Sequence, residues 1–350
     1  MESRHQRSPI ERVLIVGLGS IGRRHLALAR ELLPQADIRV LRRTKHAELA
    51  PGANALFSAL PDAVAFAPQL SIIANPAPFH LPVAMALAEA GSHLLLEKPI
   101  AHSSRGVAEL IALSARRKVR LHIAYNLRFL ASLQRFRECV HSGQIGHVHT
   151  IRCEVGQYLP SWRPEQDYRA TVSAQAALGG GVLLELSHEI DYLRWIFGEL
   201  EWVHGNLLRQ GALEIDVEDS AHLLLGFVPR AGEQQAVANV SLDFIRRDTT
   251  RYCLALGSEG SLRWDGISGQ LMHYTPEQAE WRELFAHTPK RDDTYRMQLE
   301  NMLDGIASGV APAVTGSDAL AVMQIIEAIR LSAQEGGRRM SVYAQNRQVP

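Results

Sequence analysis

Three glycines follow a short apolar run near the start of the chain at a regular spacing. The run Val13–Val16 is of the kind buried in a parallel strand, and Gly17, Gly19 and Gly22 come directly after it in the order G-x-G-x-x-G. Gly17 permits a tight turn, Gly19 lets a pyrophosphate approach the backbone, and Gly22 lets the next helix pack on the strand. That helix, expected from Ser20 to Leu33, would direct its N-terminal amides at the pyrophosphate. The residues assigned to this dinucleotide site are Gly17, Gly19, Ser20, Ile21 and Gly22.

The second expected strand, Asp37–Leu41, ends in two arginines, Arg42 and Arg43. A site that prefers NAD usually places an Asp or Glu roughly 20 residues past the glycines, where it accepts from the ribose 2′-hydroxyl. Arg42 stands at that distance, whereas Asp37 comes too early in the strand. Two arginines favour a 2′-phosphate and hence NADP, with NAD also possible. The alternative is that both arginines are solvated charges on a loop.

A carboxylate and a histidine share one face of a later expected helix, Val182–Phe197. Glu185, His188 and Asp191 recur at i, i+3 and i+6, so the first two are neighbours. A carboxylate in this position can fix the tautomer of a histidine and raise its basicity, which makes His188 a candidate for proton transfer and leaves Asp191 a structural role. The E-x-x-H pattern could also be half of a carboxylate-bridged metal site, but that needs a second copy. The sequence has none, and we expect no metal.

The elements that must position these groups change in character along the chain. Strands alternate with helices up to about residue 126, which predicts a doubly wound parallel α/β sheet. Ligands of such sheets bind beyond the carboxyl ends of the strands, where the loops 75–80, 97–99 and 125–129 lie. The expected strands are Val13–Val16, Asp37–Leu41, Leu70–Ala74, His93–Leu96 and Arg120–Ala124, and the helices are Ser20–Leu33, Leu81–Ala90 and Ser103–Lys118.

Beyond this point, strand-like runs follow one another with no helix between them, which is typical of an antiparallel sheet in an α+β domain. We expect a first domain at 1–126 and a second at 127–350. An open sheet with an apolar face must be covered, so we expect a homodimer or homotetramer. The expected elements are helices Ser132–Ser142, Val182–Phe197, Thr294–Ser308 and Ser317–Glu335, and strands His149–Val155, Trp202–Leu208, Ala221–Phe227, Ala236–Phe244, Arg251–Leu256 and Ser261–Trp264.

Composition excludes several classes of partner for this chain of 350 residues. Lys plus Arg equals Asp plus Glu at 37 each, so bulk charge favours neither nucleic acid nor a membrane surface. No apolar run approaches the roughly 20 residues of a membrane span, and the polar start MESRHQRSPIER is not a signal peptide. Cys139, Cys153 and Cys253 are widely separated. They fit reduced thiols in the cytoplasm and give neither a disulfide framework nor a zinc site.

Four stretches in this order resemble the Gfo/Idh/MocA family of NAD(P)-dependent oxidoreductases. They are GLGSIGRRHL at Gly17–Leu26, the segment Ala74–Ala101 with its E-K-P motif, YNLRF at Tyr125–Phe129, and GGGVLLELSHEIDYLRWIFG at Gly179–Gly198. The resemblance implies an N-terminal Rossmann domain and a C-terminal domain built on an open, largely antiparallel sheet. It also implies a dehydrogenase or reductase acting on a hydroxyl or keto carbon of a sugar or sugar nucleotide.

The resemblance carries the family's catalytic lysine onto Lys98, in Glu97-Lys98-Pro99, and implies a cis bond before Pro99. Oxidation of a secondary alcohol requires removal of the hydroxyl proton, and a partly desolvated lysine beside a cationic nicotinamide can accept or relay it. Without the resemblance, a surface lysine at a strand end would be the plainer interpretation. Glu97 is expected to orient Lys98 or the nicotinamide pocket.

His188 matches the family's proton-transferring histidine, while Glu185 departs from the pattern. Much of the family has Asp where this chain has Leu184, and a related subgroup has Asp at the position of Glu185, so the role of Glu185 stays open. Asn75, Pro76 and His80, with Glu97 and Lys98, match the cofactor loops. The residues expected to line the substrate pocket are Tyr125, Asn126, Arg128, Trp162, Arg163, Tyr168, Arg169 and Glu185.

Arginine forks and aromatic faces suit sugar hydroxyls, carboxylates or phosphates. The alternative for residues 162–169, which include Asp167, is a surface loop with its own ion pairs. Two other functions stay open for the whole chain. One is a glycosidase of the same fold that uses a tightly held NAD without net turnover, and the other is a non-catalytic NADP-binding scaffold.

Overall fold

The computed structural model describes residues 10–43, 48–229 and 232–342, and the chain divides into two compact units. The first holds the chain up to Asn126 together with Arg291–Leu320, and the second holds Leu127–Lys290 and the chain from Ala321. Residues 291–320 belong to the first unit although they lie far along the chain. Residues 1–9, on which most of the signal-peptide interpretation rests, lie outside the described residues.

The first unit is built on a six-stranded sheet in the order β3-β2-β1-β4-β5-β6, in which every neighbouring pair is parallel. This confirms the doubly wound α/β prediction. Its strands are β1 (Arg12–Val16), β2 (Asp37–Leu41), β3 (Ala55–Phe57), β4 (Leu70–Ile73), β5 (His93–Leu96) and β6 (Leu121–Ile123). Its helices are α1 (Ser20–Leu32), α2 (Leu60–Ala65), the 3-10 turn η1 (Ala77–Phe79), α3 (His80–Glu89), α4 (Val107–Arg117) and α8 (Asp293–Ser308). The sequence did not predict β3 and α2, which are too short to show a periodicity.

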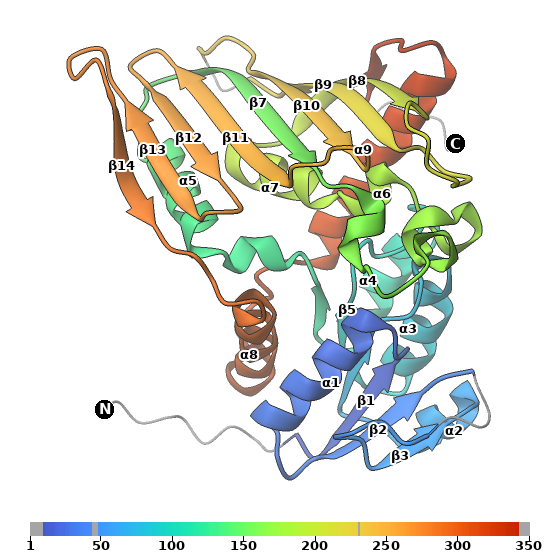
Figure 1. The fold of residues 1–350 in the computed structure, drawn as a ribbon. Coiled ribbons are helices and arrows are strands. Elements are labelled where there is room, and N and C mark those ends of the chain that lie inside the picture. The colour runs from blue at the N-terminus through green and yellow to red at the C-terminus, as the bar shows by residue number, and fades with distance from the viewer. Residues whose placement is uncertain (1–9, 44–47, 230–231, 343–350) are drawn as a thin grey trace. The chain divides into compact units, whose positions relative to one another are not determined.

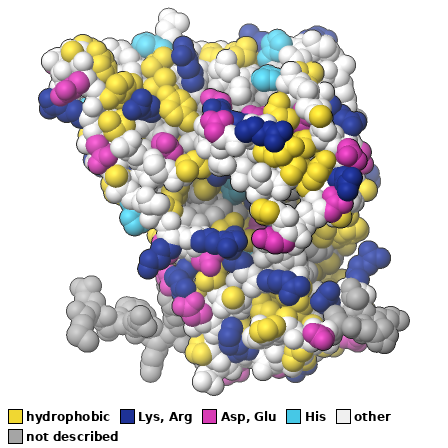
Figure 2. Space-filling model, in the orientation of Figure 1, with side chains coloured by type: hydrophobic (Ala, Val, Ile, Leu, Met, Phe, Trp, Pro, Cys, Tyr) yellow, Lys and Arg dark blue, Asp and Glu magenta, His cyan; other side chains and the backbone are white. Residues whose placement is uncertain are grey.

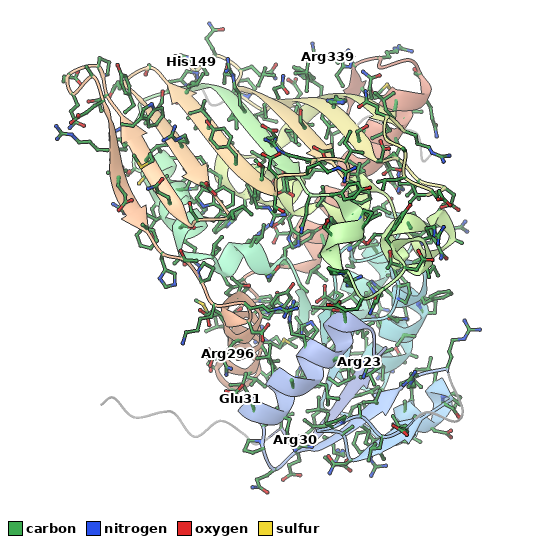
Figure 3. The ribbon with its side chains drawn as sticks, in the orientation of Figure 1. Arg23, Arg30, Glu31, His149, Arg296 and Arg339 are labelled. Atoms are coloured by element: carbon green, nitrogen blue, oxygen red, sulfur yellow. The ribbon has the colours of Figure 1, made fainter. Side chains whose placement is uncertain are left out.

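Helices α1 and α8 cover one face of this sheet, and α3 and α4 pack against each other on the other (Figure 1). The α1–α8 face buries Leu26 of α1 and Met302 of α8 against Val13 and Ile15 of β1. At its rim, Arg296 of α8 reaches Glu31 of α1, with 2.6 Å between Nη2 and Oε2 (Figure 3). A helix that follows the second sheet in sequence therefore completes the core of the first unit.

The second unit is built on a nine-stranded sheet in the order β14-β13-β12-β11-β7-β10-β9-β8-β15. All neighbours are antiparallel except β7 and β10, which confirms the mostly antiparallel prediction. Its strands are β7 (Val148–Gly156), β8 (Leu200–Leu208), β9 (Ser220–Phe227), β10 (Val237–Asp243), β11 (Thr250–Gly257), β12 (Ser261–Asp265), β13 (Gln270–Tyr274), β14 (Trp281–Ala286) and β15 (Met340–Ser341). Its helices are α5 (Ala131–His141), α6 (Val182–Glu185), α7 (His188–Phe197) and the later turns of α9 (Gly316–Gln334), and the 3-10 turns are η2 (Asn126–Phe129), η3 (Leu159–Trp162), η4 (Tyr168–Ala170), η5 (Val172–Ala174) and η6 (Ala176–Leu178).

Within the described residues, no helix has the length and apolar character needed to cross a bilayer. Figure 2 shows basic and acidic side chains interspersed over the visible face, in keeping with equal numbers of the two charges. The same part of the chain contains no group of three or more His, Cys, Asp or Glu side chains arranged to hold a metal ion.

The buried histidine of β6 makes the stability of the fold sensitive to acid. His122 is 2% exposed, and burial, with a smaller contribution from Arg120, lowers its pKa from 6.5 to about 4. Because the unfolded chain takes up a proton below about pH 6.5 and the folded chain does not, stability is lost as the pH falls toward 4. At about 1.4 kcal/mol per pH unit the loss reaches about 3 kcal/mol.

We therefore expect His122→Leu to remove up to about 3 kcal/mol of the stability difference between pH 7.5 and 4.5, measured by urea unfolding at both values. The matched control is His149→Gln at an exposed position of β7 (Figure 3), which should keep the wild-type pH dependence. His80 and His93, whose pKa values burial also lowers, should leave the His122 variant with a residual acid sensitivity. An unchanged pH dependence in His122→Leu would contradict this account.

Candidate functional site

The glycine turn between β1 and α1 is shaped by two close backbone approaches. A Cβ on Gly17, which has a φ of +86°, would lie 2.8 Å from the Asn75 nitrogen, and a Cβ on Gly22 would lie 2.2 Å from the Gly17 carbonyl oxygen. A Cβ on Gly19 would meet nothing within 4 Å, so this glycine leaves open space for a ligand at the helix N-terminus. The first turn of α1 also contains no acidic residue. Open amides at a helix start fit a pyrophosphate, and these residues therefore fit a dinucleotide.

The carboxyl end of β2, which is followed by Arg42, lies beside this turn. The Gly17 N–H donates to the Leu41 carbonyl oxygen at 2.9 Å, and Arg42 is the next residue. Asp37 lies at the other end of the strand, where both of its oxygens accept from Arg39 at 2.8–3.2 Å. From residue 41 to residue 47 the sequence has no Asp or Glu. The sequence of this stretch thus offers no carboxylate for the ribose 2′-hydroxyl.

His80 ties together two loops at the carboxyl edge of the parallel sheet. Its Nε2 lies 2.6 Å from the Asn75 carbonyl oxygen and its Nδ1 lies 3.1 Å from the Pro99 carbonyl oxygen. The ring is 1% exposed, and burial lowers its pKa, with the facing carbonyls and Glu97 acting in the opposite sense. Asn75 and Pro76 are half-buried beside it. His80 therefore holds the expected cofactor loop against the segment that carries Lys98.

The Glu97-Lys98-Pro99 segment follows β5 at the same edge, and the Lys98–Pro99 bond is cis, as the resemblance implied. Glu97 is 8% exposed. Its Oε1 lies 2.7 Å from Nε2 of His25, and its Oε2 accepts the Lys98 N–H at 3.2 Å. Lys98 is half-buried. The carboxylate of Glu97 is thus fixed by two donors and in turn fixes the backbone of Lys98.

Two residues expected to contact a substrate are buried in the first unit. Tyr125 is 0% exposed, and Asn126 is buried with its Nδ2 donating to Oγ1 of Thr294 at 2.8 Å. Thr294 belongs to α8. The Asn126 side chain therefore links the chain just after β6 to the returning helix.

In the second unit, the helix expected over Val182–Phe197 is divided. Helix α6 ends at Glu185 and α7 begins at His188, with Leu186 and Ser187 between them. The expectation that Glu185 and His188 are neighbours on one continuous helix is therefore wrong. Both side chains are half-buried, and each lies at the end of its own helix.

Two of the three glycines before α6, Gly180 and Gly181, are required by close packing. A Cβ on Gly180 would lie 2.3 Å from the Val172 carbonyl oxygen, and a Cβ on Gly181, which has a φ of +104°, would lie 2.4 Å from Oε1 of Glu218. The same Glu218 oxygen accepts the Leu183 N–H at 3.1 Å, and burial raises the pKa of this carboxyl group. Glu218 therefore anchors the start of α6, a role that the sequence analysis missed.

Helix α7 is held by buried charges. Asp191 forms a two-point ion pair with Arg128, with 2.6 Å between Oδ1 and Nη2 and 2.9 Å between Oδ2 and Nε. Glu189, 0% exposed, accepts from Nε of Arg251 at 2.8 Å. Asp191 has the structural role that we expected. Arg128, expected in the substrate pocket, is 5% exposed and its guanidinium serves this pair.

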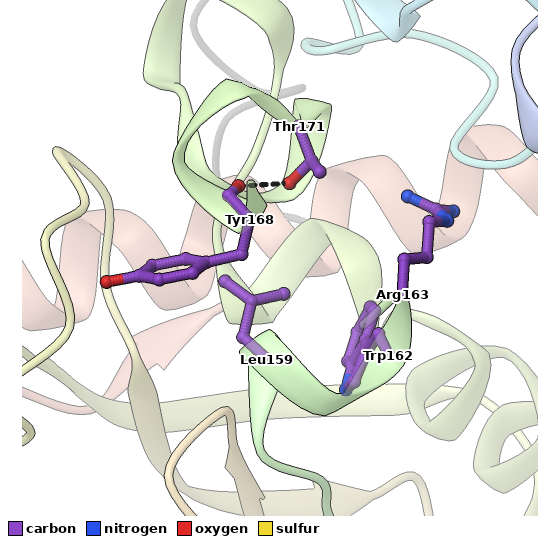
Figure 4. Close-up of a pocket in the computed structure, with 5 residues that line it drawn as sticks. All are labelled: Leu159, Trp162, Arg163, Tyr168 and Thr171. Carbon is purple, nitrogen blue, oxygen red and sulfur yellow. Dashed lines mark hydrogen bonds between the residues drawn. The ribbon is translucent and has the colours of Figure 1, made fainter. Parts of the chain in front are cut away.

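The loop around residues 159–171 contains a small pocket (Figure 4), lined by Leu159, Trp162, Arg163, Tyr168 and Thr171. Nε1 of Trp162 donates to the Gln157 carbonyl oxygen at 3.1 Å, and its ring packs edge-on against Phe244. In Figure 4 the Arg163 side chain points away from Tyr168.

The arginine at the other end of this loop has partners of its own. Arg169 is held by Asp167, at 2.9 Å from Nε to Oδ1, and by Glu214, at 3.1 Å from Nη1 to Oε2. The hydroxyl oxygen of Tyr168 accepts the Glu214 N–H at 3.1 Å. The alternative of a surface loop with its own ion pairs therefore describes Arg169 well, while Trp162 and Arg163 stay half-buried at the pocket.

Sequence reasoning missed His25, which contacts Glu97, and the pairing of Glu189 with Arg251. For His25 a signal existed, because it follows Gly22 by three residues on the expected helix and therefore shares the face that packs on the strand. For Glu189 and Arg251 no local signal existed, since 62 residues separate them.

Family models match both units of the chain. Residues 11–125 match "Oxidoreductase family, NAD-binding Rossmann fold", and residues 137–342 match "Oxidoreductase family, C-terminal alpha/beta domain". The fold and the glycine turn thus define an oxidoreductase that binds NAD or NADP through a Rossmann domain. The chain belongs to the Gfo/Idh/MocA family, as the sequence resemblance indicated, and is an NAD(P)-dependent oxidoreductase acting on CH–OH groups.

Several characterised proteins are similar to the chain. The myo-inositol 2-dehydrogenase of Thermotoga maritima is 26% identical over 270 residues, which cover 73% of this chain and 75% of the relative. The solved structure of GenD2 from gentamicin A biosynthesis with NAD has a TM-score of 0.78 at 26% identity and covers 95% of this chain and 97% of its own. A levoglucosan dehydrogenase with NADH and levoglucosan has a TM-score of 0.80 at 21% identity and covers 95% and 99% of the two chains, a likeness of fold.

The Arg128–Asp191 pair gives a prediction for stability. Asp191→Ala leaves the Arg128 guanidinium buried without its carboxylate, so we expect a loss of about 3–5 kcal/mol in the free energy of unfolding, measured with guanidinium chloride. The double variant Arg128→Met/Asp191→Leu removes both charges and should be more stable than Asp191→Ala alone. A double variant no more stable than Asp191→Ala would contradict this account of the pair.

Proposed function

We propose that this chain is a dehydrogenase or reductase for a hydroxyl or keto carbon of a sugar or sugar nucleotide, with Lys98 and His188 in proton transfer. The observation that carries the proposal is the position of Lys98. It is half-buried at the carboxyl edge of β5, on the same edge as the open glycine turn, and Glu97 holds its backbone. When bound, a nicotinamide would supply the hydride acceptor or donor.

Lys98 has the chemistry for the proton of the reacting hydroxyl. When a secondary alcohol loses hydride, its hydroxyl proton must leave, and the amine at Nζ of Lys98 can accept or relay it. When charged, the same group stabilises a developing alkoxide. In the reducing direction the ammonium returns the proton to the carbonyl oxygen.

His188 is the second group in this proposal. It is the first residue of α7, a helix whose position is fixed by the buried pairs at Glu189 and Asp191. An imidazole on such a rigid support can exchange a proton with a substrate without moving. Glu185, half-buried at the end of α6, is proposed as a substrate contact rather than as the partner of His188.

The residues that we expected to line the substrate pocket fall into two groups, one accessible to a ligand and one buried. Trp162, Arg163 and Tyr168 are half-buried and Arg169 is exposed, so we keep these four as proposed substrate contacts, with Arg163 the strongest because Arg169 is already ion-paired. Tyr125, Asn126 and Arg128 are buried and are proposed to position the loops. In the cofactor group, half-buried Asn75, Pro76 and Lys98 can touch the ligand, whereas buried His80 and Glu97 act through their neighbours.

The names of the relatives support a polyhydroxylated ring as substrate. They include an inositol dehydrogenase, a scyllo-inositol 2-dehydrogenase that uses NADP⁺ in Bacillus subtilis, and a levoglucosan dehydrogenase. The fold also matches a Bordetella pertussis WlbA dehydrogenase solved with NADH and UDP-GlcNAcA. These ligands share adjacent ring hydroxyls.

The expected cytoplasmic location and the homodimer or homotetramer stay predictions. The oligomer is supported by apolar side chains such as Leu208 and Leu224, each 39% exposed on the second sheet.

The first test is catalytic. Purified protein is assayed with myo-inositol, scyllo-inositol, levoglucosan and UDP-N-acetylglucosaminuronic acid, each with NAD⁺ and NADP⁺. We expect Lys98→Met and His188→Gln each to lower kcat about 100-fold or more, while NADH and NADPH binding, followed by fluorescence, changes less than about threefold. Exposed Lys290→Met and His149→Gln are the matched controls and should keep full activity.

Wild-type activity retained by Lys98→Met would reject the proposed role of the lysine. Product formation without net change in the nicotinamide would identify the glycosidase alternative. If none of these compounds reacts and NADPH still binds, a scaffold role gains support.

A second test concerns the two arginines after β2. Arg42→Asp places a carboxylate beside the glycine turn, so we expect it to weaken NADPH binding at least tenfold more than NADH binding, which is about 1.4 kcal/mol of discrimination. Arg116→Asp, the same charge change at an exposed position of α4, is the control and should leave the ratio unchanged. Equal losses for both cofactors would show that Arg42 does not contact the 2′-phosphate.

A further inference from the structure

A buried histidine connects the helix of the glycine turn to the segment that carries Lys98. His25 is 0% exposed and lies one turn after Gly22 on the face of α1 that packs on the sheet. Its Nε2 is 2.7 Å from Oε1 of Glu97. The ring of Tyr295, from α8, meets it edge-on with 6.0 Å between the centroids.

The direction of this hydrogen bond follows from the partners. An ionised carboxylate only accepts, so Nε2 carries the hydrogen and donates to Glu97. The other carboxylate oxygen accepts the N–H of Lys98 at 3.2 Å. Nδ1 of His25 has no hydrogen-bond partner among the residues that the structure describes, so the ring orientation depends on the Glu97 contact and on Tyr295. A chain of two hydrogen bonds therefore runs from α1 through Glu97 to the Lys98 backbone.

We propose that His25 is a positioning residue for Lys98, acting through Glu97. The inference rests on the proposed function for the role of Lys98. Donors on both oxygens restrict the rotation of the Glu97 side chain, and a restricted carboxylate holds the Lys98 amide in one place. Catalytic groups held this way react faster because their geometry is already productive. His25 thereby couples the cofactor-binding helix to the proposed proton-transfer group.

Removing the donor has a local consequence. In His25→Leu the buried Glu97 carboxylate loses the histidine donor and keeps the backbone N–H of Lys98. A buried carboxylate that has lost a hydrogen bond tends to turn toward water. The glycine turn itself is held by other contacts, such as the Gly17 N–H to the Leu41 carbonyl oxygen at 2.9 Å. We therefore expect His25→Leu to retain cofactor binding but to lose the fixed position of the Lys98 backbone.

The first experiment needs no substrate. Hydrogen–deuterium exchange of the full-length protein is followed by mass spectrometry for peptides spanning residues 93–101, and NADH binding is followed by fluorescence. We expect the Lys98 amide to exchange about tenfold faster in His25→Leu than in the wild type, with the NADH dissociation constant changed less than threefold. His25→Gln, whose amide nitrogen can still donate to Glu97, should restore the slow exchange.

A control separates this effect from general destabilisation. Leu28→Ala removes a buried side chain from the same helix, at a position 3% exposed, and leaves both hydrogen-bond donors to Glu97, His25 and the Lys98 N–H, in place. It should lower the melting temperature while leaving exchange at Lys98 as in the wild type. Equal acceleration in Leu28→Ala and His25→Leu would overturn the proposal, as would unchanged exchange in His25→Leu.

A kinetic cycle tests the path through Glu97, using the compound from the panel above that turns over. We expect His25→Leu to lower kcat at least tenfold with KM for the nicotinamide within threefold, and His25→Gln to recover most of kcat. In a protein that already carries Glu97→Gln, His25→Leu should lower kcat little further, because both substitutions break the same chain of contacts.

If the losses of kcat in His25→Leu and Glu97→Gln add fully in the double variant, the path through Glu97 is rejected. The outcome is separable from that of the proposed function. If Lys98→Met keeps its activity, the lysine has another role even when the exchange result stands. If Lys98→Met is inactive and His25→Leu is fully active, only the present inference fails.

Discussion

The close approach of Gly22 to the Gly17 carbonyl oxygen is the constraint on which the first unit depends. A Cβ at Gly22 would lie 2.2 Å from that oxygen, so the chain can make this turn from β1 into α1 only with glycine at position 22. The turn places the first amides of α1 at the open edge of the sheet. One helical turn later, the same face presents His25 to Glu97 at 2.7 Å. The glycine turn and the contacts that hold the Lys98 backbone therefore depend on the same strand-to-helix geometry.

The second unit relies on a different interaction, the pairing of charges away from water. Asp191 and Glu189 are 1% and 0% exposed, and each faces an arginine. An unpaired charge at such depth costs several kcal/mol, so α7 has few alternatives to its observed position. His188 stands at the first residue of this helix. The charges that hold α7 also fix the backbone of the residue proposed to exchange a proton.

Local sequence patterns predicted individual strands and helices but not the contacts between distant parts of the chain. The bounds of β2 and β5 match the sequence prediction, because short apolar runs between helices indicate buried parallel strands. Strands β13 and β14 were missed because QLMHY and WRELFA are too polar to stand out. The break between α6 and α7 was missed because apolar residues continue through Leu186. Partners distant in sequence, such as Arg128 and Asp191 at 63 residues, are fixed by tertiary packing that spacing does not encode.

The degree of burial distinguishes ionisable side chains that hold the structure from those that a ligand can reach. Glu97, Glu189 and Asp191 are at most 8% exposed, and each is committed to a named donor within 2.9 Å. A carboxylate held in this way keeps its place, which suits it to orient other groups. Lys98, Glu185 and His188 are half-buried, so a ligand can reach them while surrounding protein limits their hydration. Proton exchange with a substrate needs that intermediate exposure, which is why we propose proton transfer for Lys98 and His188 rather than for the buried carboxylates.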